Sequence, residues 1–199
     1  MICVLSGVGS EVPGRAQVDA EVEVKFPPEA LTLPRMRLEV SMAWSVADLL
    51  FVNAGVKNDD RETIADVSTE EFVRVMITNA LGPMRVIEGL QDLVFPNGTI
   101  GIMSSGQGSI ANNVNGNYEV YRGSKAALNM FMRSFAARHA NDRRTLLLMA
   151  PGWVRTEMGG PHARLSIEES IPNLADTMEA QSGKAGLQYL DYLGRQIPW

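Results

Sequence analysis

Tyr121 and Lys125 are the two residues whose types and spacing most directly suggest chemistry. They stand four residues apart in Tyr-Arg-Gly-Ser-Lys, where a long helical pattern begins. Residues four apart on a helix share one face, so the phenol and the ammonium can address the same pocket. A fixed cation favours the phenolate and lowers the pKa of a tyrosine from its ordinary value of about 10. The pair suggests an acid–base site, although such spacing is more often that of an ordinary amphipathic helix.

Three other segments place polar residues or glycines directly after short apolar runs. They are Asn53-Ala54-Gly55, Ser104-Ser105 and Pro151-Gly152. Such runs are typical of buried strands in a parallel sheet, and functional residues gather at the carboxyl ends of these strands. We therefore expect the three segments and the helix face that carries Tyr121 to meet at one crevice.

Helical patterns separate the apolar runs. Ser68 to Glu71 and Ser166 to Glu169 have the spacing of a capping box, in which a serine and a glutamate close the start of a helix. Apolar residues at helical spacing predict a long helix over about 120–139. Gly82-Pro83 falls inside the helix that follows Ser68 and should kink or interrupt it, because proline lacks a backbone donor.

The alternation of apolar strands with amphipathic helices predicts an α/β fold: a Rossmann-like, doubly wound, mostly parallel sheet in a single domain over residues 1–199. Residues 1–48 are atypical. Short strands are expected at 2–5 and 36–40, and only eight residues separate the latter from the run that begins at Leu49. A parallel crossover needs roughly a dozen residues or more, so the first βαβ units are expected to be shortened or rearranged.

Composition and charge exclude several other classes of protein. Lys+Arg 18 against Asp+Glu 23 gives a net charge of −5, with no basic block that suggests nucleic-acid binding. The single cysteine, Cys3, cannot form an internal disulfide. No apolar run approaches the roughly 18 residues of a membrane span, and the first residues lack a signal-peptide pattern. We expect a cytoplasmic protein without membrane or nucleic-acid partners.

The two histidines, His139 and His162, favour neither a metal site nor a hydrolase. Neither has carboxylate or cysteine neighbours at ligand spacing, so no metal is expected. A serine hydrolase is a distant alternative, since Ser105 also lacks a Gly-x-Ser-x-Gly setting.

Over about residues 49–199 the sequence resembles the short-chain dehydrogenase/reductase family, in particular its carbonyl-reductase-like and C-factor-like members. The matching segments occur in family order and are Phe51 to Gly55, Thr78 to Pro83, Ile102 to Ser105, Tyr121 to Asn129 and Pro151 to Thr156. Asp191 to Trp199 is also similar to that subgroup. The resemblance implies an NAD(P)-dependent oxidoreductase that transfers a hydride between nicotinamide and a small carbonyl or alcohol substrate.

The resemblance implies a catalytic set of four residues. Tyr121 would be the general acid–base. Ser105 would hold and polarise the substrate oxygen, with Ser104 as the alternative. Asn79 would support a proton-relay water from within its helix. Lys125 would lower the pKa of the tyrosine and bind the hydroxyls of the nicotinamide ribose.

The resemblance also implies which residues line the cofactor, NAD or NADP. Besides Tyr121 and Lys125, these are Asn53, Ala54, Gly55, Pro151, Gly152, Val154 and Thr156. The helix over 120–139 carries Met130, Phe131, Met132 and Phe135, a stripe of a kind that more often belongs to the core. In this family, however, the equivalent helix commonly packs against its twin. The resemblance therefore also implies a homo-oligomer.

The N-terminal part departs from the family pattern. The family holds the dinucleotide phosphates with Thr-Gly-x-x-x-Gly-x-Gly after the first strand. The corresponding stretch, Ser6 to Gly14, has glycines without that spacing, and its Glu11 would repel a phosphate. The alternative hypothesis is therefore a non-catalytic, truncated relative that serves as a binding or assembly module.

Overall fold

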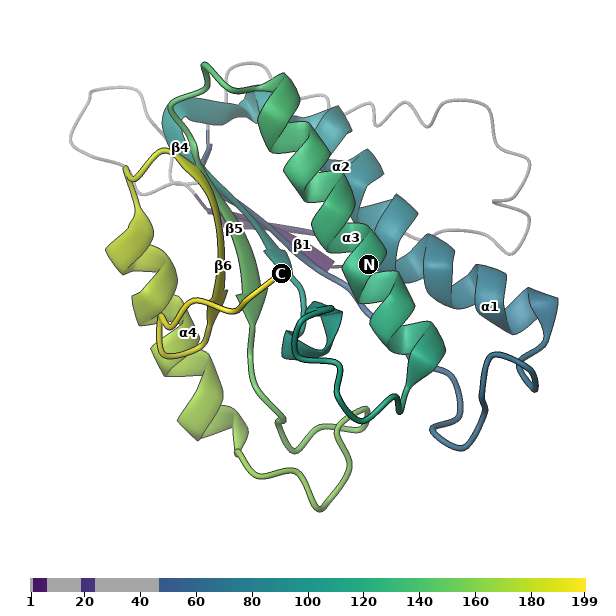
Figure 1. The fold of residues 1–199 in the computed structure, drawn as a ribbon. Helices are drawn as coiled ribbons and strands as arrows, with labels where there is room; N and C mark the ends of the chain where they lie inside the picture. The colour runs from purple at the N-terminus through teal and green to yellow at the C-terminus, as the bar shows by residue number, and fades with distance from the viewer. Residues whose placement is uncertain (1, 7–18, 24–46) are drawn as a thin grey trace.

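The computed structural model describes residues 2–6, 19–23 and 47–199 of the chain. These residues form one six-stranded sheet with helices on both faces (Figure 1). The strands are β1 (Ile2–Ser6), β2 (Asp19–Glu23), β3 (Ala47–Asn53), β4 (Val94–Met103), β5 (Thr145–Ala150) and β6 (Gly186–Asp191). The strand predicted at 36–40 and the stretch from Gly7 to Gly14 lie outside the described residues.

The four strands β3, β4, β5 and β6 run parallel and in chain order across the sheet. Val52, Ile102, Leu148 and Tyr189 pair in one continuous row, and all four are buried. The row fixes the register, so the segments that follow these strands leave the sheet at the same edge. The predicted α/β, mostly parallel sheet is confirmed.

The first two strands are arranged differently from the rest. The edge strand is β2, and β1 lies between β2 and β3 and pairs antiparallel with both. Ile2 lies opposite Asn53 and Ser6 lies opposite Leu49. The described part of the N-terminal region is thus rearranged, as the short spacing in the sequence indicated.

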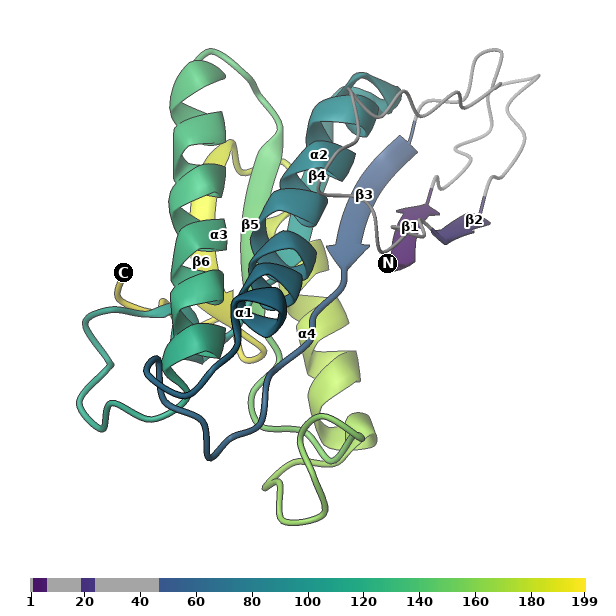
Figure 2. The same ribbon diagram turned by 90° about the vertical axis from the view of Figure 1, so that its right-hand side faces the viewer.

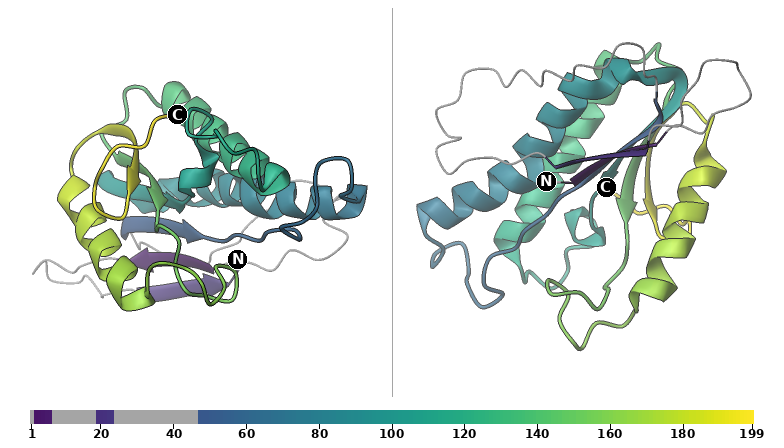
Figure 3. Two further views of the ribbon diagram at one scale, coloured as in Figure 1. Left: turned by 60° about the horizontal axis from the view of Figure 1, so that its bottom comes forward. Right: turned by 180° about the vertical axis from the view of Figure 1, so that it is seen from behind.

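Helices cover the two faces of the sheet in separate layers. The α-helices of the described residues are α1 (Thr69–Met76), α2 (Gly82–Leu90), α3 (Glu119–Arg138) and α4 (Ile167–Gln181). Figure 2 shows α1, α2 and α3 in front of the strands with α4 behind, and Figure 3 shows the layers from two further directions. The sheet is therefore doubly wound.

Alternation along the strands supplies both apolar cores. Val52 and Leu148 pack in the core that α2 and α3 cover, whereas their neighbours Phe51 and Leu147 pack with Leu174 of α4. Successive side chains of a strand point to opposite faces, so continuous apolar runs are what a sheet covered on both faces requires.

The Gly82-Pro83 pair interrupts the regular helix, as predicted, without ending it. Between α1 and α2 the chain forms a π-helical turn, η2 (Ile77–Leu81), and Pro83 lies in the first turn of α2. Proline lacks the amide that would donate to a preceding carbonyl, and the π turn that accompanies this missing donor lies directly before it. The π turn places Asn79 where the helix is widened, and such turns are frequent at functional sites.

Both predicted helix starts are confirmed. The Ser68 hydroxyl accepts from the backbone amide of Glu71 at 3.1 Å. At α4 the capping box is complete: the Ser166 hydroxyl accepts from the Glu169 amide, and the Glu169 carboxylate accepts from the Ser166 amide. These caps satisfy amides that a helix start leaves unpaired.

The buried row across the parallel strands leads to a prediction for stability. Leu148 is fully buried at its centre, so Leu148→Ala should lower the free energy of unfolding by about 3 kcal/mol in urea denaturation. Ile171→Ala, at a position on α4 that is 42% exposed, is the matched control and should change the stability little. Equal losses for the two variants would contradict the assigned core.

Candidate active site

Asn79 ties together the parts of the site that come from three segments. Its side-chain nitrogen donates to the carbonyl of Val56 and to the hydroxyl of Ser124, each at 2.8 Å. Its side-chain oxygen accepts from the Val56 amide, also at 2.8 Å. Asn79 is fully buried, and both hydrogens of its amide are used in these bonds. The residue therefore fixes the segment after β3 against η2 and α3.

Lys125 carries its ammonium into the interior behind that segment. The residue is 2% exposed, and Nζ donates to the carbonyl of Met103 at 3.0 Å. A Cβ built on Gly55 would lie 3.5 Å from Nζ and 3.7 Å from Oδ1 of Asn79. Because glycine has no side chain, a ligand can approach the ammonium over residue 55. Burial lowers the pKa of Lys125 to about 8.

Tyr121 lies one helical turn before Lys125 and contacts Ser105. Burial raises the pKa of its phenol, and the hydrogen bond with the Ser105 side chain lowers it. Burial prevails, so the pKa of Tyr121 lies above its ordinary value. A nearby cation lowers the pKa of a phenol, but removing the phenol from water raises it, and Tyr121 is buried.

The two adjacent serines after β4 have different surroundings. Ser104 is buried: its amide donates to Met149 at 2.7 Å, and its hydroxyl donates to Oδ1 of Asn129 at 2.6 Å. Ser105 instead accepts from the Gln107 amide at 3.2 Å at the start of the short helix η4 (Gly106–Gly108), and its side chain meets Tyr121. Of the two hydroxyls, the one next to the phenol is that of Ser105.

The segment after β5 is held close to α4. The hydroxyl of Ser170 donates to the carbonyl of Pro151 at 2.6 Å, and Val154 forms a parallel bridge with Leu165. Gly152 has φ 82°, and a Cβ there would lie 2.7 Å from a methyl carbon of Leu165. Only glycine adopts this conformation readily and leaves space for the leucine.

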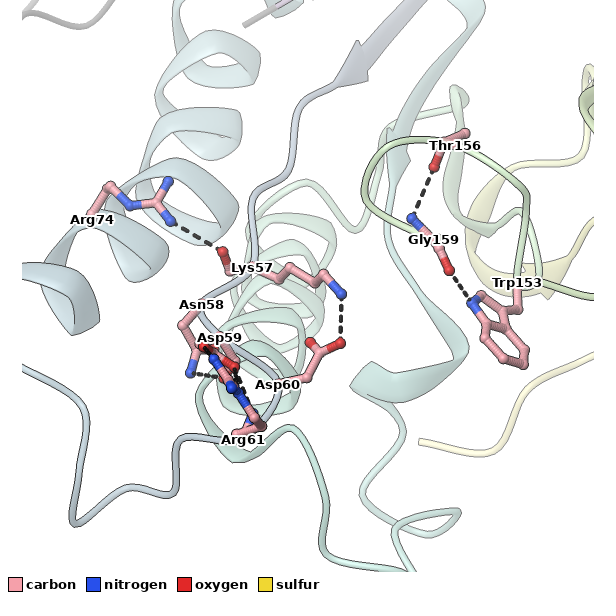
Figure 4. Close-up of polar contacts among 9 residues, drawn as sticks. All are labelled: Lys57, Asn58, Asp59, Asp60, Arg61, Arg74, Trp153, Thr156 and Gly159. Atoms are coloured by element: carbon pink, nitrogen blue, oxygen red, sulfur yellow. Dashed lines mark hydrogen bonds and ion pairs between the residues drawn. The ribbon is translucent and has the colours of Figure 1, made fainter. Parts of the chain in front are cut away.

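The same segment continues into a loop closed by its own hydrogen bonds. The Thr156 hydroxyl accepts from the Gly159 amide at 3.1 Å, and the Trp153 indole donates to the Gly159 carbonyl at 2.8 Å (Figure 4). The Trp153 side chain is nevertheless 57% exposed. Thr156 is thus positioned by the loop itself, and an apolar ring stands beside it at the surface.

The loop after β3 is closed by ion pairs. Lys57 pairs with Asp60 at 2.7 Å, and Arg61 pairs with Asp59 at 2.5 Å. Arg74 of α1 donates to the Lys57 carbonyl at 3.1 Å (Figure 4). These contacts hold the loop to α1, and the Lys57 and Arg61 cations already have carboxylate partners.

The described residues fit the nicotinamide end of a dinucleotide. The buried ammonium of Lys125 can donate further hydrogen bonds to ribose hydroxyls, and Gly55 leaves the space above it free of a side chain. Asn53 ends β3 and Ala54 follows it, while Pro151, Gly152, Val154 and Thr156 follow the carboxyl end of β5 at the same edge.

The phosphate end has no such cradle among the residues that the structure describes. The strand β1 ends at Ser6, which lies opposite Leu49 at the amino end of β3. Tyr121 and Lys125 lie at the carboxyl end of β3, where Ile2 of β1 lies opposite Asn53. This differs from the arrangement implied by the resemblance, in which the glycine loop follows the first strand at the carboxyl edge.

The described residues contain no group of three or more histidine, cysteine, aspartate or glutamate side chains that could hold a metal ion. Among the helices of the same residues, none is long and apolar enough to cross a membrane.

The sequence-based prediction missed Ser124 and Asn129. Ser124 is fully buried, accepts from Asn79 and donates to the Tyr121 carbonyl at 2.7 Å. Asn129 accepts from Ser104 and donates to the carbonyl of Gly108 at 3.3 Å. Polar residues at buried positions of an amphipathic helix are the signal that could have identified both.

The burial of Lys125 predicts a pH-dependent cost in stability. Its pKa falls from 10.5 in water to about 8, so between these values the unfolded chain binds more protons than the folded one. Stability therefore rises with pH across this window, and the cost below it is about 3 kcal/mol. Lys125→Met removes this cost but leaves the Met103 carbonyl without its hydrogen bond. The free energy of unfolding at pH 7 should therefore rise by only about 2 kcal/mol.

Urea denaturation at pH 7 and pH 10 measures this effect. The gain of Lys125→Met over the wild type should shrink between the two values. Lys184→Met, at an exposed position, is the control for the same chemical change. A variant that is less stable than the wild type at both pH values would show that the ammonium stabilises the fold.

Comparisons with known proteins identify relatives of this chain. A family model described as enoyl-(acyl carrier protein) reductase matches residues 30–181. The C-signal protein of Myxococcus xanthus is 34% identical over 156 residues, which cover 76% of this chain and 92% of that protein.

Solved structures include relatives as well. A short-chain dehydrogenase/reductase from Burkholderia multivorans with bound NADP superimposes with a TM-score of 0.77 at 63% identity, covering 78% of this chain and 68% of that one. A carbonyl reductase from Pseudomonas aeruginosa PAO1 in complex with NADP gives a TM-score of 0.71 at 36% identity, covering 77% and 67%. The chain belongs to the short-chain dehydrogenase/reductase family.

Proposed function

We propose that the chain is an NAD(P)-dependent oxidoreductase that transfers a hydride between nicotinamide and a small carbonyl or alcohol. The observation that carries this proposal is the meeting of Tyr121 with Ser105, one helical turn from the buried ammonium of Lys125 beside Gly55. Replacing a buried charged side chain by an apolar one often stabilises a protein. The buried amine of Lys125 therefore supports a functional role for this residue.

In this proposal Tyr121 exchanges a proton with the substrate oxygen. A phenol held against Ser105 can donate to a carbonyl oxygen on reduction and accept from an alcohol on oxidation. Ser105 holds the same oxygen and polarises it. The hydroxyl of Ser104 already donates to Asn129 inside the protein, which supports Ser105 over Ser104 for this role.

Lys125 would hold the cofactor and tune the tyrosine. Its remaining ammonium hydrogens would bind the ribose hydroxyls, and its charge would favour the phenolate form of Tyr121. When bound, the nicotinamide supplies the hydride chemistry, and its oxidised ring adds a second positive charge near the phenol. Two cations would offset the upward shift that burial imposes on the pKa of Tyr121.

The segments after β3 and β5 would line the cofactor. Asn53, Ala54 and Gly55 allow close backbone approach on one side. On the other side, Pro151, Gly152, Val154 and Thr156 would face the nicotinamide, with the Thr156 hydroxyl and backbone groups orienting its carboxamide. NADP is the cofactor to test first, because relatives from Burkholderia multivorans and Pseudomonas aeruginosa were solved with it.

We also propose that Asn79 supports a proton-relay water through its backbone in η2. Its side-chain amide already donates to Val56 and Ser124, so the main chain of the π turn would hold the water.

A homo-oligomer is also proposed. Met130 and Phe131 of α3 are 59% and 45% exposed in the single chain, and such an apolar face could pack against a second copy.

A non-catalytic binding or assembly module is the second candidate function. The observation that favours it is the antiparallel β1, whose end lies away from the site edge. Thermal unfolding with and without NADPH distinguishes the two candidates. A saturable rise of the midpoint supports the oxidoreductase, whereas none at millimolar NADPH supports the module.

Removing the phenol tests the proposed acid–base. Tyr121→Phe should lower kcat for NADPH-dependent reduction of small aldehydes by roughly 10²- to 10⁴-fold, because no group replaces the proton donor. Its affinity for NADPH, measured by fluorescence titration, should stay nearly that of the wild type. Tyr118→Phe, three residues earlier at the start of α3, is the matched control and should keep its activity. Full activity in Tyr121→Phe would eliminate the mechanism.

A further inference from the structure

We propose that Tyr189 of β6 is a positioning residue for Ser105 and that Trp199 holds Tyr189 in place. This inference rests on the proposed function of Ser105. It concerns Tyr189, which precedes the segment from Asp191 to Trp199, and Trp199 within that segment, neither of which has a role in the site described above.

The hydroxyl of Tyr189 reaches the loop after β4 from the neighbouring side of the sheet. It donates to the backbone carbonyl of Ser105, and the side chains of Asn129 and Ser104 lie near enough to lower its pKa. Tyr189 is 3% exposed. Burial raises its pKa to about 12, so the hydroxyl stays protonated and remains a donor at any pH at which the protein would work.

Two donors fix the peptide of Ser105. Besides Tyr189, the amide of Gly108 donates to the Ser105 carbonyl at 2.9 Å. The residue just before it, Ser104, is itself bonded to β5 and α3 through Met149 and Asn129. With its carbonyl held, the extended residue 105 directs its side chain towards Tyr121.

Trp199 supports the same loop at a second point. Its carbonyl accepts from the amide of Ala111 at 3.0 Å, and its ring lies 5.5 Å from that of Tyr189. The guanidinium of Arg133 on α3 stands 4.8 Å over the indole. Figure 1 shows the segment after β6 running back to the loop after β4. The loop from Ser105 to Ala111 is thus held at both ends by β6 and the residues after it.

The ring and the hydroxyl of Tyr189 have separate roles: the ring packs in the core, and the hydroxyl bonds to Ser105. The other members of its row are the aliphatic residues Leu148, Ile102 and Val52, so the row needs only an apolar side chain at this point. A phenylalanine would fill the same space. The hydroxyl is the part of Tyr189 that acts on Ser105.

Tyr189→Phe is therefore the test. In an active wild type, kcat should fall by about tenfold while the affinity for NADPH is unchanged, because a small displacement of Ser105 affects the reacting oxygen and not the cofactor. In the oxidation direction, the rise of kcat/KM with pH should move to higher pH, because Tyr121 loses some of the hydrogen bonding that favours its phenolate.

A spectroscopic readout needs no turnover. With 13C-labelled tyrosine, NMR titration follows each phenol, and Tyr→Phe variants assign Tyr121 among the four tyrosines. The Tyr121 titration should move upward in Tyr189→Phe. If the wild type neither binds NADPH nor turns over while this shift is present, the proposed function fails and the positioning by Tyr189 stands.

Thr145→Val is the matched control. It removes another hydroxyl that donates to a backbone carbonyl, that of Gln181, at the opposite end of the sheet. This variant should leave kcat and the Tyr121 titration unchanged. Trp199→Ala should reproduce part of the effect of Tyr189→Phe, and Trp199→Phe, which keeps an aromatic ring against Tyr189, should restore it.

Two results would overturn the inference. One is a Tyr189→Phe variant with the kcat and the Tyr121 titration of the wild type. The other is a parallel fall of NADPH affinity, kcat and thermal stability that Thr145→Val shows equally, since this would mark Tyr189 as a general packing residue.

Discussion

The burial of the Lys125 ammonium is the constraint on which the rest of the site depends. The amine lies behind Gly55, bonded to the end of β4, at a depth that lowers its pKa to about 8. Nothing in the packing of α3 requires a cation there. Asn79 holds the segment that carries Gly55, and the parallel pairing of β3 with β4 brings that segment to the same edge as Ser105.

The parallel strands and helix α3 contribute different parts of the site. The row from Val52 to Tyr189 fixes where each strand ends, while α3 supplies both the phenol and the ammonium from one face. Loops with internal hydrogen bonds and ion pairs complete the edge on either side. The site is therefore assembled from the rigid parts of the fold, and its loops are positioned before any ligand arrives.

Much of this architecture could be predicted from the sequence, because it follows from local patterns. The capping box at α4, the long helix and the four parallel strands depend on residues close in the chain and were found as predicted. At Ser68 only the serine half of the predicted box forms, because the Glu71 carboxylate pairs with Arg74 instead. The antiparallel pairing of β1 could not be predicted, because a short strand can pair with its neighbour in either direction. The bond from Tyr189 to Ser105 joins residues 84 apart, and no local pattern reports such a contact.

The proposed function requires that this edge of the sheet hold nicotinamide in one orientation for hydride transfer. The most direct measurement is the transfer of deuterium to a small aldehyde from NADPH labelled at either of the two C4 positions. The alcohol product should carry deuterium from one of the two labelled cofactors and not from the other. Alcohol without deuterium from either cofactor, or with equal deuterium from both, would contradict the proposed function.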